Sequence, residues 1–221
     1  MRLLDLYCGG GGAAAGYIDA GFEVTGVDLK DHSAYYPGNF VQGNALEYVQ
    51  EHGHEYDAVH ASPPCQAYSS ITADHDRHPD LVGPTREALF LAGRPWVMEN
   101  VVGSPVRPDL KLCGSHFDLV SSGYLLKRHR LFELEGFAVP QPKCTCAGRK
   151  VAGVYGNLPP ERSAFREYGR PDKNRGVKFP LSDAQRVMGV KLPKEVVVQA
   201  IPRAYTHYIG KYLMEALSGT S

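Results

Sequence analysis

A short apolar run followed by four glycines opens the chain and sets the strongest limit on its fold. The stretch RLLDLY (2–7) predicts a buried strand, and Gly9 to Gly12 predict an abrupt turn. AAAGYIDAGF (13–22) has helical spacing, and EVTGVDL (23–29) predicts a β-branched strand that ends in an acid. A strand, a glycine turn, a helix and a second strand indicate a parallel β-α-β unit.

The same alternation continues to about residue 101. FVQGNALEYVQEH (40–52) predicts a strand, a turn and a helix, and DAVHA (57–61) predicts the next strand. TREALFLAG (85–93) predicts a helix, and PWVMENVV (95–102) predicts a strand that carries an acid near its end. We therefore expect an α/β fold, with a mainly parallel sheet and helices on both faces.

The regularity falls away in the second half of the chain. LLKRHRLFEL (125–134) alternates like a strand, and the stretch after it is rich in Pro, Gly and basic residues. SDAQRVMGV (182–190) and AYTHYIGKYLMEAL (204–217) predict two closing helices. We therefore expect one domain formed by 1–132 and 181–221, with a small irregular insertion at 133–180.

Composition excludes several classes of protein. The chain has 221 residues, 43% of them hydrophobic, which suits one globular domain and argues against disorder. No stretch approaches the roughly 20 apolar residues of a membrane span, and the N-terminus lacks the pattern of a signal segment. Five cysteines are an odd and uneven set, which predicts a reducing cytoplasm rather than a disulfide framework.

Charge is balanced overall but unevenly distributed. Residues 127–178 contain twelve Lys or Arg and five acids, so this segment carries +7 and the rest of the chain −7. Such asymmetry favours a polyanionic partner, because phosphate contacts are the main source of nucleic-acid affinity. A solvated basic surface explains the charge equally well.

A cysteine directly behind two prolines marks a candidate catalytic loop. In HASPPCQAYSS (60–70), Pro63 and Pro64 fix the backbone and exclude helix and central strand. Cys65 is thus placed on a rigid loop at a strand end, the edge where α/β enzymes carry out their chemistry. A lone cysteine is more often a small core residue than a nucleophile. We interpret Cys8, inside the glycine turn, as structural.

Three further groups of side chains are candidates for binding or catalysis. Asp28 ends the second strand, where a carboxylate can accept hydrogen bonds from ribose hydroxyls, so the glycine turn favours an adenosine-containing ligand. Glu99 follows an apolar run, and desolvation there would raise its pKa toward neutral pH. Arg128 and Arg130 would lie on one face of a strand and could position Glu99. A structural tight turn, a Glu–Arg pair and solvated surface arginines are the alternatives.

Zinc is disfavoured by the cysteine spacing. Cys144 and Cys146 form a Cys-x-Cys pair that could bind a metal, but the other candidate ligands are far away along the chain: Cys113, His116 and His129. We therefore predict no metal site.

These pieces, in this order, resemble the DNA cytosine-5 methyltransferases. DLYCGGGGAAAG is similar to the first cofactor motif of that family, and SPPCQ is similar to its nucleophile motif. ENV (99–101) resembles the motif of the catalytic glutamate, Arg128-His129-Arg130 the paired-arginine motif, and IPRAYTHYIG (201–210) the closing helix motif. The resemblance covers most of 1–132 and returns at 182–214.

The resemblance implies a Rossmann-like class I S-adenosylmethionine-dependent methyltransferase fold. It also implies Cys65, Glu99, Arg128 and Arg130 as catalytic residues, and it makes 133–180 a short basic target-recognition region. The cofactor-binding residues that it implies are Asp5, Tyr7, Cys8, Gly9, Gly10, Gly12, Asp28, Leu29, Asn44, Ala45, Pro63, Pro64 and Gln199. The expected nucleic-acid-binding residues are Ser62, Gln66, Ser69, Lys127, Lys143, Arg149, Lys150, Arg162 and Arg166.

The activity expected from the resemblance is methyl transfer from S-adenosylmethionine to carbon 5 of cytosine in DNA, by a monomeric enzyme with no membrane partner. Its small size suits a phage or mobile-element modification enzyme. RNA or a free cytosine nucleotide is an alternative substrate, and a catalytically silent nucleic-acid-binding relative is the alternative outside enzymes. Dinucleotide-dependent oxidoreduction would leave Cys65 without a role.

The sequence departs from the family pattern at four places. Leu126 stands where the arginine motif usually begins with glutamine, and Asn44 replaces an acid that often contacts adenine. Val198–Gln199 takes the place of a Gly-Asn pair, and Arg203 follows where small residues are usual. These departures bear on the cofactor contacts and on the methyl donor.

Overall fold

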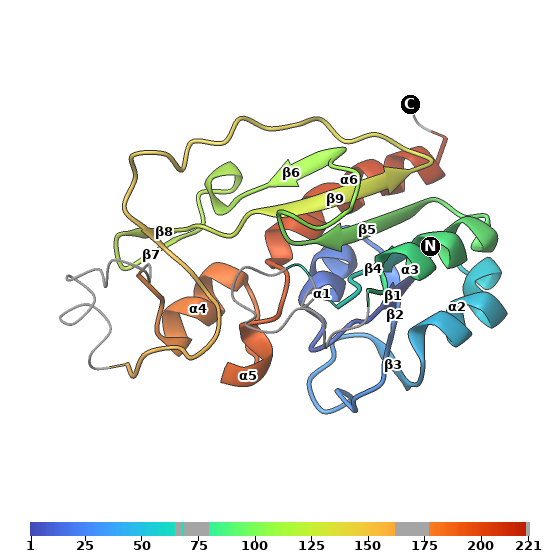
Figure 1. The fold of residues 1–221 in the computed structure, drawn as a ribbon, viewed down its shortest axis with the longest axis horizontal. Helices are drawn as coiled ribbons and strands as arrows, with labels where there is room; N and C mark the ends of the chain where they lie inside the picture. Colours follow the sequence, from blue (N-terminus) through green and yellow to red (C-terminus); the bar gives the residue numbers. More distant parts are fainter. Residues whose placement is uncertain (65–67, 69–79, 162–176, 220–221) are drawn as a thin grey trace.

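A seven-stranded sheet forms the centre of the molecule (Figure 1). The computed structural model describes residues 1–64, 68, 80–161 and 177–219. The strands of this sheet are β3 (Asn39–Gln42), β2 (Glu23–Asp28), β1 (Arg2–Leu6), β4 (Ala58–Ala61), β5 (Trp96–Asn100), β9 (Arg130–Glu135) and β6 (Leu110–Leu112), in this order across the sheet. Strands β1 to β5 pair in parallel, and β9 lies antiparallel between β5 and β6. The mainly parallel sheet is confirmed.

Helices cover both faces of this sheet, also as predicted. On one face, α1 (Gly12–Asp19) and α6 (Arg203–Leu217) share a buried cluster with Leu3 of β1. On the other face, α2 (Ala45–His52) and α3 (Val82–Ala92) pack with Leu4 and Leu6 of the same strand. Successive side chains of a strand point to opposite faces, so the continuous apolar run of β1 supplies both layers.

The start of α3 differs from its prediction. The helix begins at Val82 rather than at residue 85, because the Asp80 carboxylate accepts a hydrogen bond from the Val82 amide at 2.9 Å. Pro84 is tolerated there, since the first turn of a helix leaves its amides unpaired in any case.

The prediction of one alternating strand over 125–134 was wrong. The chain forms β8 (Tyr124–Leu126), leaves the strand conformation at 127–129, and resumes as β9. β8 belongs to a separate small sheet with β7 (Val120–Ser121) and β10 (Val151–Ala152). The two arginines therefore do not lie on one face of a strand, because the chain passes from one sheet to the other between them.

A third buried cluster forms beside this small sheet. Its core includes Leu126, Phe179 and Met188, and it takes in α4 (Leu181–Met188) and α5 (Lys194–Val197). Figure 1 shows these two helices below β7 and β8, away from the long sheet. The division between 1–132 with 181–221 and 133–180 remains a prediction.

Two short 3-10 helices, η1 (Gly53–Glu55) and η3 (Gly114–His116), complete the elements described. Residues 136–150 contain no helix or strand. None of the helices in the described part of the chain has the length and apolarity that crossing a membrane requires.

Candidate active site

The glycine turn connects β1 to α1 at the carboxyl edge of the sheet. Gly9 has φ +49, and its amide donates to Asp28 Oδ2 at 3.0 Å. A Cβ atom at Gly9 would meet no atom within 4 Å, whereas one at Gly11 would collide with Pro37 and one at Gly12 would lie 2.7 Å from the Ile201 carbonyl oxygen. Gly11 and Gly12 are thus needed for packing, and Gly9 faces open space.

Asp28 and Leu29 lie beside that open space. The Asp28 carboxylate accepts hydrogen bonds from the backbone amides of Gly9 and Lys30, each at 3.0 Å. Further lone pairs on its oxygens remain available to accept hydrogen bonds from a ligand. Leu29 is 71% exposed, an unusual state for a large apolar side chain next to a charged one. A carboxylate, an exposed apolar side chain and an uncovered turn fit a ligand that carries a ribose and an aromatic base.

Asp5 and Cys8 lie beneath the turn. Asp5 is fully buried, and burial raises its pKa to about 7, although the Tyr36 hydroxyl donates to Oδ2 at 3.1 Å. Its Oδ1 has no hydrogen-bond partner among the described residues. Burial also raises the pKa of the Cys8 thiol, with Asp5 and Asp28 adding to the effect, so Cys8 stays neutral.

The other predicted cofactor residues have mixed surroundings. Asn44 caps α2: its side chain accepts a hydrogen bond from the Leu46 amide at 3.0 Å, so the residue that replaces the usual acid stabilises the start of the helix.

The rest of the predicted cofactor residues differ in burial and contacts. Tyr7 Oη lies 2.9 Å from Thr85 Oγ1. Gly10 is buried where a Cβ would collide with Val196. Ala45 and Pro63 are buried, Pro64 is half-buried, and Gln199 is exposed.

Glu99 is the last residue but one of β5 and lies in an environment that favours its protonated form. The residue is 6% exposed, and its Oε1 lies 2.8 Å from Arg130 Nε. Burial raises the pKa of Glu99, and the charges of Arg130 and Arg128 and a hydrogen bond with Ser62 only partly offset the effect. The predicted rise is therefore confirmed in direction, and Arg130 is the arginine that pairs with the acid.

The buried His60 contacts Glu99 indirectly, through Ser62, and the sequence prediction missed this histidine. His60 Nδ1 lies 3.0 Å from Tyr17 Oη, and His60 Nε2 lies 2.9 Å from Ser62 Oγ. Burial lowers the pKa of His60 to about 3, so the ring is neutral and holds Ser62, which in turn bonds Glu99. The signal available was a histidine inside the apolar strand DAVHA, two residues before Ser62. Ser62, which the resemblance implies as a nucleic-acid-binding residue, therefore lies beside Glu99.

Asn100, the last residue of β5, connects this strand to the Pro63–Pro64 segment that follows β4. Its Nδ2 donates to the Pro63 carbonyl oxygen at 3.0 Å, and its Oδ1 accepts from the Val101 amide at 2.8 Å. The residue is buried, so it fixes where the chain leaves β4 toward residue 65. Cys65, Gln66 and Ser69 themselves lie outside the described residues.

Arg128 has different surroundings from those predicted. It is 6% exposed, and its guanidinium donates to the carbonyl oxygens of Val154, Val198 and Ala200. Its own carbonyl oxygen accepts from the Tyr205 hydroxyl at 2.6 Å. These contacts join residues 128–130, here called the arginine segment, to the chain just after β10, to the chain just after α5 and to α6, so Arg128 holds these parts of the backbone together.

The remaining departures also have structural partners. Leu126 is fully buried in the cluster beneath α4 and α5, where a glutamine amide would need its own partners. Arg203 forms an ion pair with Asp19 of α1 through two nitrogens.

The predicted nucleic-acid residues are only partly described. Lys127, Lys143, Arg149 and Lys150 are exposed, and Arg149 pairs with Asp118 at 3.1 Å. Arg162 and Arg166 lie outside the described residues.

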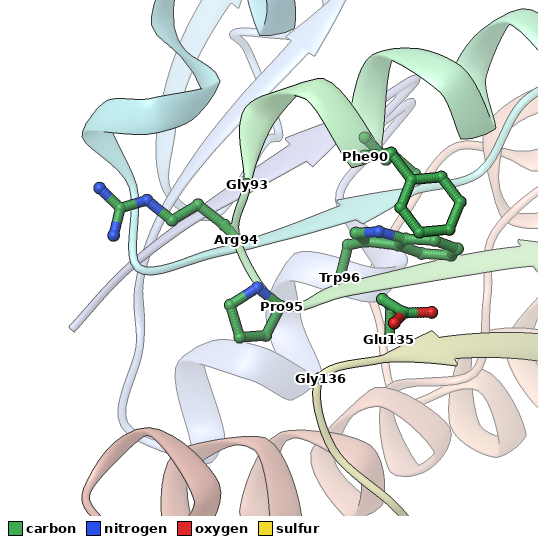
Figure 2. Close-up of a pocket in the computed structure, with 8 residues that line it drawn as sticks. Phe90, Gly93, Arg94, Pro95, Trp96, Glu135 and Gly136 are labelled. Carbon is green, nitrogen blue, oxygen red and sulfur yellow. The ribbon is translucent and has the colours of Figure 1, made fainter.

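A hollow of about 280 Å³ lies at the opposite edge of the sheet. Figure 2 shows it between the start of β5 and the end of β9, where the Phe90 ring lies against Trp96. The two rings meet edge to face, with centroids 5.3 Å apart. The candidate site at the carboxyl edge is a different place.

The solved structures with a fold similar to that of this chain include three that match it over almost its full length. A protein described as a DNA modification methyltransferase, encoded within a prophage of E. coli, has a TM-score of 0.63 and 14% identity over 99% of both chains. A mutant of Spodoptera frugiperda DNMT2 has a TM-score of 0.58 and 15% identity, over 97% of this chain and 99% of that one. S. pombe Dnmt2 has a TM-score of 0.58 and 12% identity, over 98% and 99%.

No protein-family model matches the chain, and no curated protein matches it. The structural likeness and the sheet order define the fold: the chain has a Rossmann-like α/β fold that it shares with solved methyltransferases. Among those methyltransferases, its structural neighbours include a DNA modification methyltransferase and DNMT2 proteins, so its fold is that of compact enzymes similar to DNA methyltransferases.

Proposed function

We propose that the protein transfers a methyl group to carbon 5 of cytosine in DNA, through a covalent bond between Cys65 and the base. The observation that carries the proposal is Glu99: it is buried at the carboxyl end of β5, paired with Arg130, and joined through Asn100 to the loop that leads to Cys65. An acid at the end of one strand, and a thiol four residues after the neighbouring strand in the sequence, are the two groups that this chemistry needs.

Each group would have a defined task. Carbon 5 of cytosine is a poor nucleophile, and addition of the Cys65 thiolate at carbon 6 makes the ring enamine-like. Glu99 would donate a proton to ring nitrogen 3 and so absorb the negative charge that develops there. Its raised pKa supports this task, because a carboxyl group must hold its proton before it can donate it. Arg130 would keep Glu99 oriented and contact the oxygen on carbon 2 of the base.

S-adenosylmethionine would supply the methyl group. Gly9, Asp28 and Leu29 are the residues that would hold it, on the evidence of the open turn, the carboxylate and the exposed apolar side chain. Carbon 5 would take this methyl group, with S-adenosylhomocysteine as the leaving group. Loss of the carbon-5 proton to a water molecule and departure of the Cys65 thiolate from carbon 6 would then release the methylated base. The target base must leave the duplex to reach the site, at a cost of a few kcal/mol.

The decisive experiment is Cys65→Ser. We expect methyl transfer to cytosine-containing duplex DNA to fall below detection, while binding of S-adenosylmethionine, measured by calorimetry, stays within a factor of about two. Turnover at the wild-type rate would remove the nucleophile assignment.

Substrate class is tested by transfer of a tritiated methyl group to duplex DNA, transfer RNA and dCMP in parallel. We expect DNA to be the best acceptor, because the basic segment 127–178 and the likeness to a DNA modification methyltransferase both favour it. Preference for RNA or dCMP would keep the chemistry and change the substrate. No transfer to any of them, with cofactor binding intact, would support a silent relative.

Asp28→Ala tests the cofactor site separately. We expect the affinity for S-adenosylmethionine to fall about 10- to 100-fold, because hydrogen bonds to a charged group are lost, while affinity for DNA changes little. Equal losses of both affinities, measured by calorimetry and by DNA titration, would show that the site has been assigned wrongly.

A further inference from the structure

Three cysteines and one histidine, scattered along the sequence, meet at one place in the fold. Cys113 follows β6, His129 lies between β8 and β9, and Cys144 and Cys146 lie in the irregular segment after β9. Their ligand atoms all lie within 4.8 Å of one another. Cys113 and His129 are thus distant from the Cys-x-Cys pair along the chain but close to it in space. The prediction of no metal site must therefore be reconsidered.

The spacing of three of these atoms is close to that of a tetrahedral zinc centre. Sγ of Cys144 lies 3.4 Å from Sγ of Cys146 and 3.5 Å from Nε2 of His129, and Sγ of Cys146 lies 3.7 Å from the same nitrogen. Zinc bonds of about 2.3 Å to sulfur and about 2.0 Å to nitrogen place tetrahedral ligands roughly 3.5–3.8 Å apart. We propose that Cys113, His129, Cys144 and Cys146 bind one structural zinc ion.

The chemistry of the set points to zinc in particular. Three thiols and an imidazole are soft and borderline ligands that suit zinc, whereas magnesium and calcium take oxygen ligands. Four protein ligands complete the tetrahedron and leave no open position, which is the pattern of a structural site rather than a catalytic one. The sulfur atoms of Cys144 and Cys146 are too far apart for a disulfide, which needs about 2.05 Å.

A second layer of contacts supports the ligands. Ser115 Oγ lies 3.4 Å from Cys144 Sγ and accepts a hydrogen bond from the Thr145 amide at 3.2 Å. The Cys113 amide donates to His116 Nδ1 at 3.3 Å. Such contacts fix the direction of metal ligands. They also hold the Cys-x-Cys segment against η3.

The zinc ion would cross-link a part of the chain that lacks regular structure. Residues 136–150 have no helix or strand, and Figure 1 shows the trace after β9 running back over β6 toward β8. Besides the cluster, this segment is held by two hydrogen bonds between Gln141 and the backbone of Lys111, by a hydrogen bond from the Tyr208 hydroxyl to the Pro140 carbonyl oxygen, and by the buried side chain of Val139. A bond to His129 would join it to the arginine segment, because His129 lies between Arg128 and Arg130.

The test is the metal content of tag-free protein purified from zinc-supplemented cells. We expect about one zinc per chain by plasma mass spectrometry. After zinc removal under reducing conditions, cobalt(II) should restore a complex with the visible absorption of tetrahedral thiolate coordination. Neither readout depends on methyl transfer, so failure here is distinct from failure of the proposed function.

Variants identify the ligands. Cys144→Ser and His129→Ala should each reduce zinc to well below half an equivalent. His129→Cys should retain zinc, because a fourth thiolate serves equally well. Cys8→Ser is the matched control: it removes one thiol from the glycine turn and should leave zinc content unchanged.

Three outcomes would overturn the proposal. One is wild-type protein with neither zinc nor a cobalt spectrum. Another is full zinc content in both Cys144→Ser and His129→Ala. The third is a Cys144–Cys146 disulfide in the purified protein with no metal uptake after reduction.

Discussion

The sheet of residues 1–100 and the segment 101–158 are stabilised by different kinds of contact. In the first region, parallel strands bond to one another and helices cover both faces. In the second, every strand except β9 has two or three residues, and side chains bond to distant backbone: Arg128 to three carbonyl oxygens, Arg107 to Leu134, and Gln141 to Lys111. Glu99 and the proposed cofactor residues therefore lie on a regular scaffold, whereas the position of the arginine segment depends on individual side chains.

The largest effect expected from this difference is at Arg128. Arg128→Met leaves three carbonyl oxygens without their donor in a buried place, and we expect the free energy of unfolding to fall by about 3 kcal/mol or more. Urea unfolding of wild type and variant measures the loss.

Arg130→Met is the matched control two residues away. Its loss leaves Glu99 without an ion-pair partner, but Glu99 can bind a proton, so we expect a smaller loss of stability and a larger loss of methyl transfer. A stability of Arg128→Met within about 0.5 kcal/mol of wild type would contradict the dependence on side chains.

In the regular region, the buried acid Asp5 makes stability depend on pH. The pKa of Asp5 is about 7 in the fold against an ordinary 3.8, so the fold favours its protonated form. The contribution of Asp5 to the free energy of unfolding is therefore most favourable below pH 3.8, and it is lost as the pH rises through 7. Between about pH 5 and pH 8 we expect wild type to lose about 2–3 kcal/mol through Asp5.

Asp5→Asn should remove this pH dependence, because an amide does not titrate and its oxygen can still accept from Tyr36. Unfolding by urea at the two pH values, without cofactor, measures it for both proteins. An equally steep fall in Asp5→Asn would assign the pH dependence to another group.

The two regions also differ in how far the sequence predicted them. The sheet, its helices and the position of Glu99 follow from local patterns: apolar runs, glycine turns and acids at strand ends. The break at 127–129 could not be predicted, because it depends on carbonyl oxygens contributed by Val154, Val198 and Ala200. Likewise, the sequence indicates only that His60 is a core residue, because its role depends on its contacts with Ser62 and Tyr17 in the fold.

The cysteine cluster shows the same limit. Cys144 and Cys146 are separated by one residue, but Cys113 and His129 reach them only through the path of β6, β8 and β9. Spacing rules for zinc assume ligands supplied in close pairs, and two of these four residues are single. Sequence patterns therefore predict sites on regular scaffolds better than sites formed by long connections.

The smallest expected effect separates backbone strain from ligand contact. Gly9 (φ +49) and Gly123 (φ +78) both adopt left-handed conformations, and a Cβ at either would meet no atom within 4 Å. Gly9 lies in the glycine turn and Gly123 in the turn between β7 and β8. Alanine at either position should cost about 1 kcal/mol of stability, because the left-handed conformation is strained for a residue with a side chain.

Only Gly9→Ala should weaken the binding of S-adenosylmethionine, because its new methyl group would occupy the open space beside Asp28. Calorimetric titration of the two variants, with thermal unfolding as the stability measure, makes the comparison. Equal cofactor affinity in both would place the ligand away from the turn, and the regular region would then supply a scaffold without the cofactor contacts assigned to it.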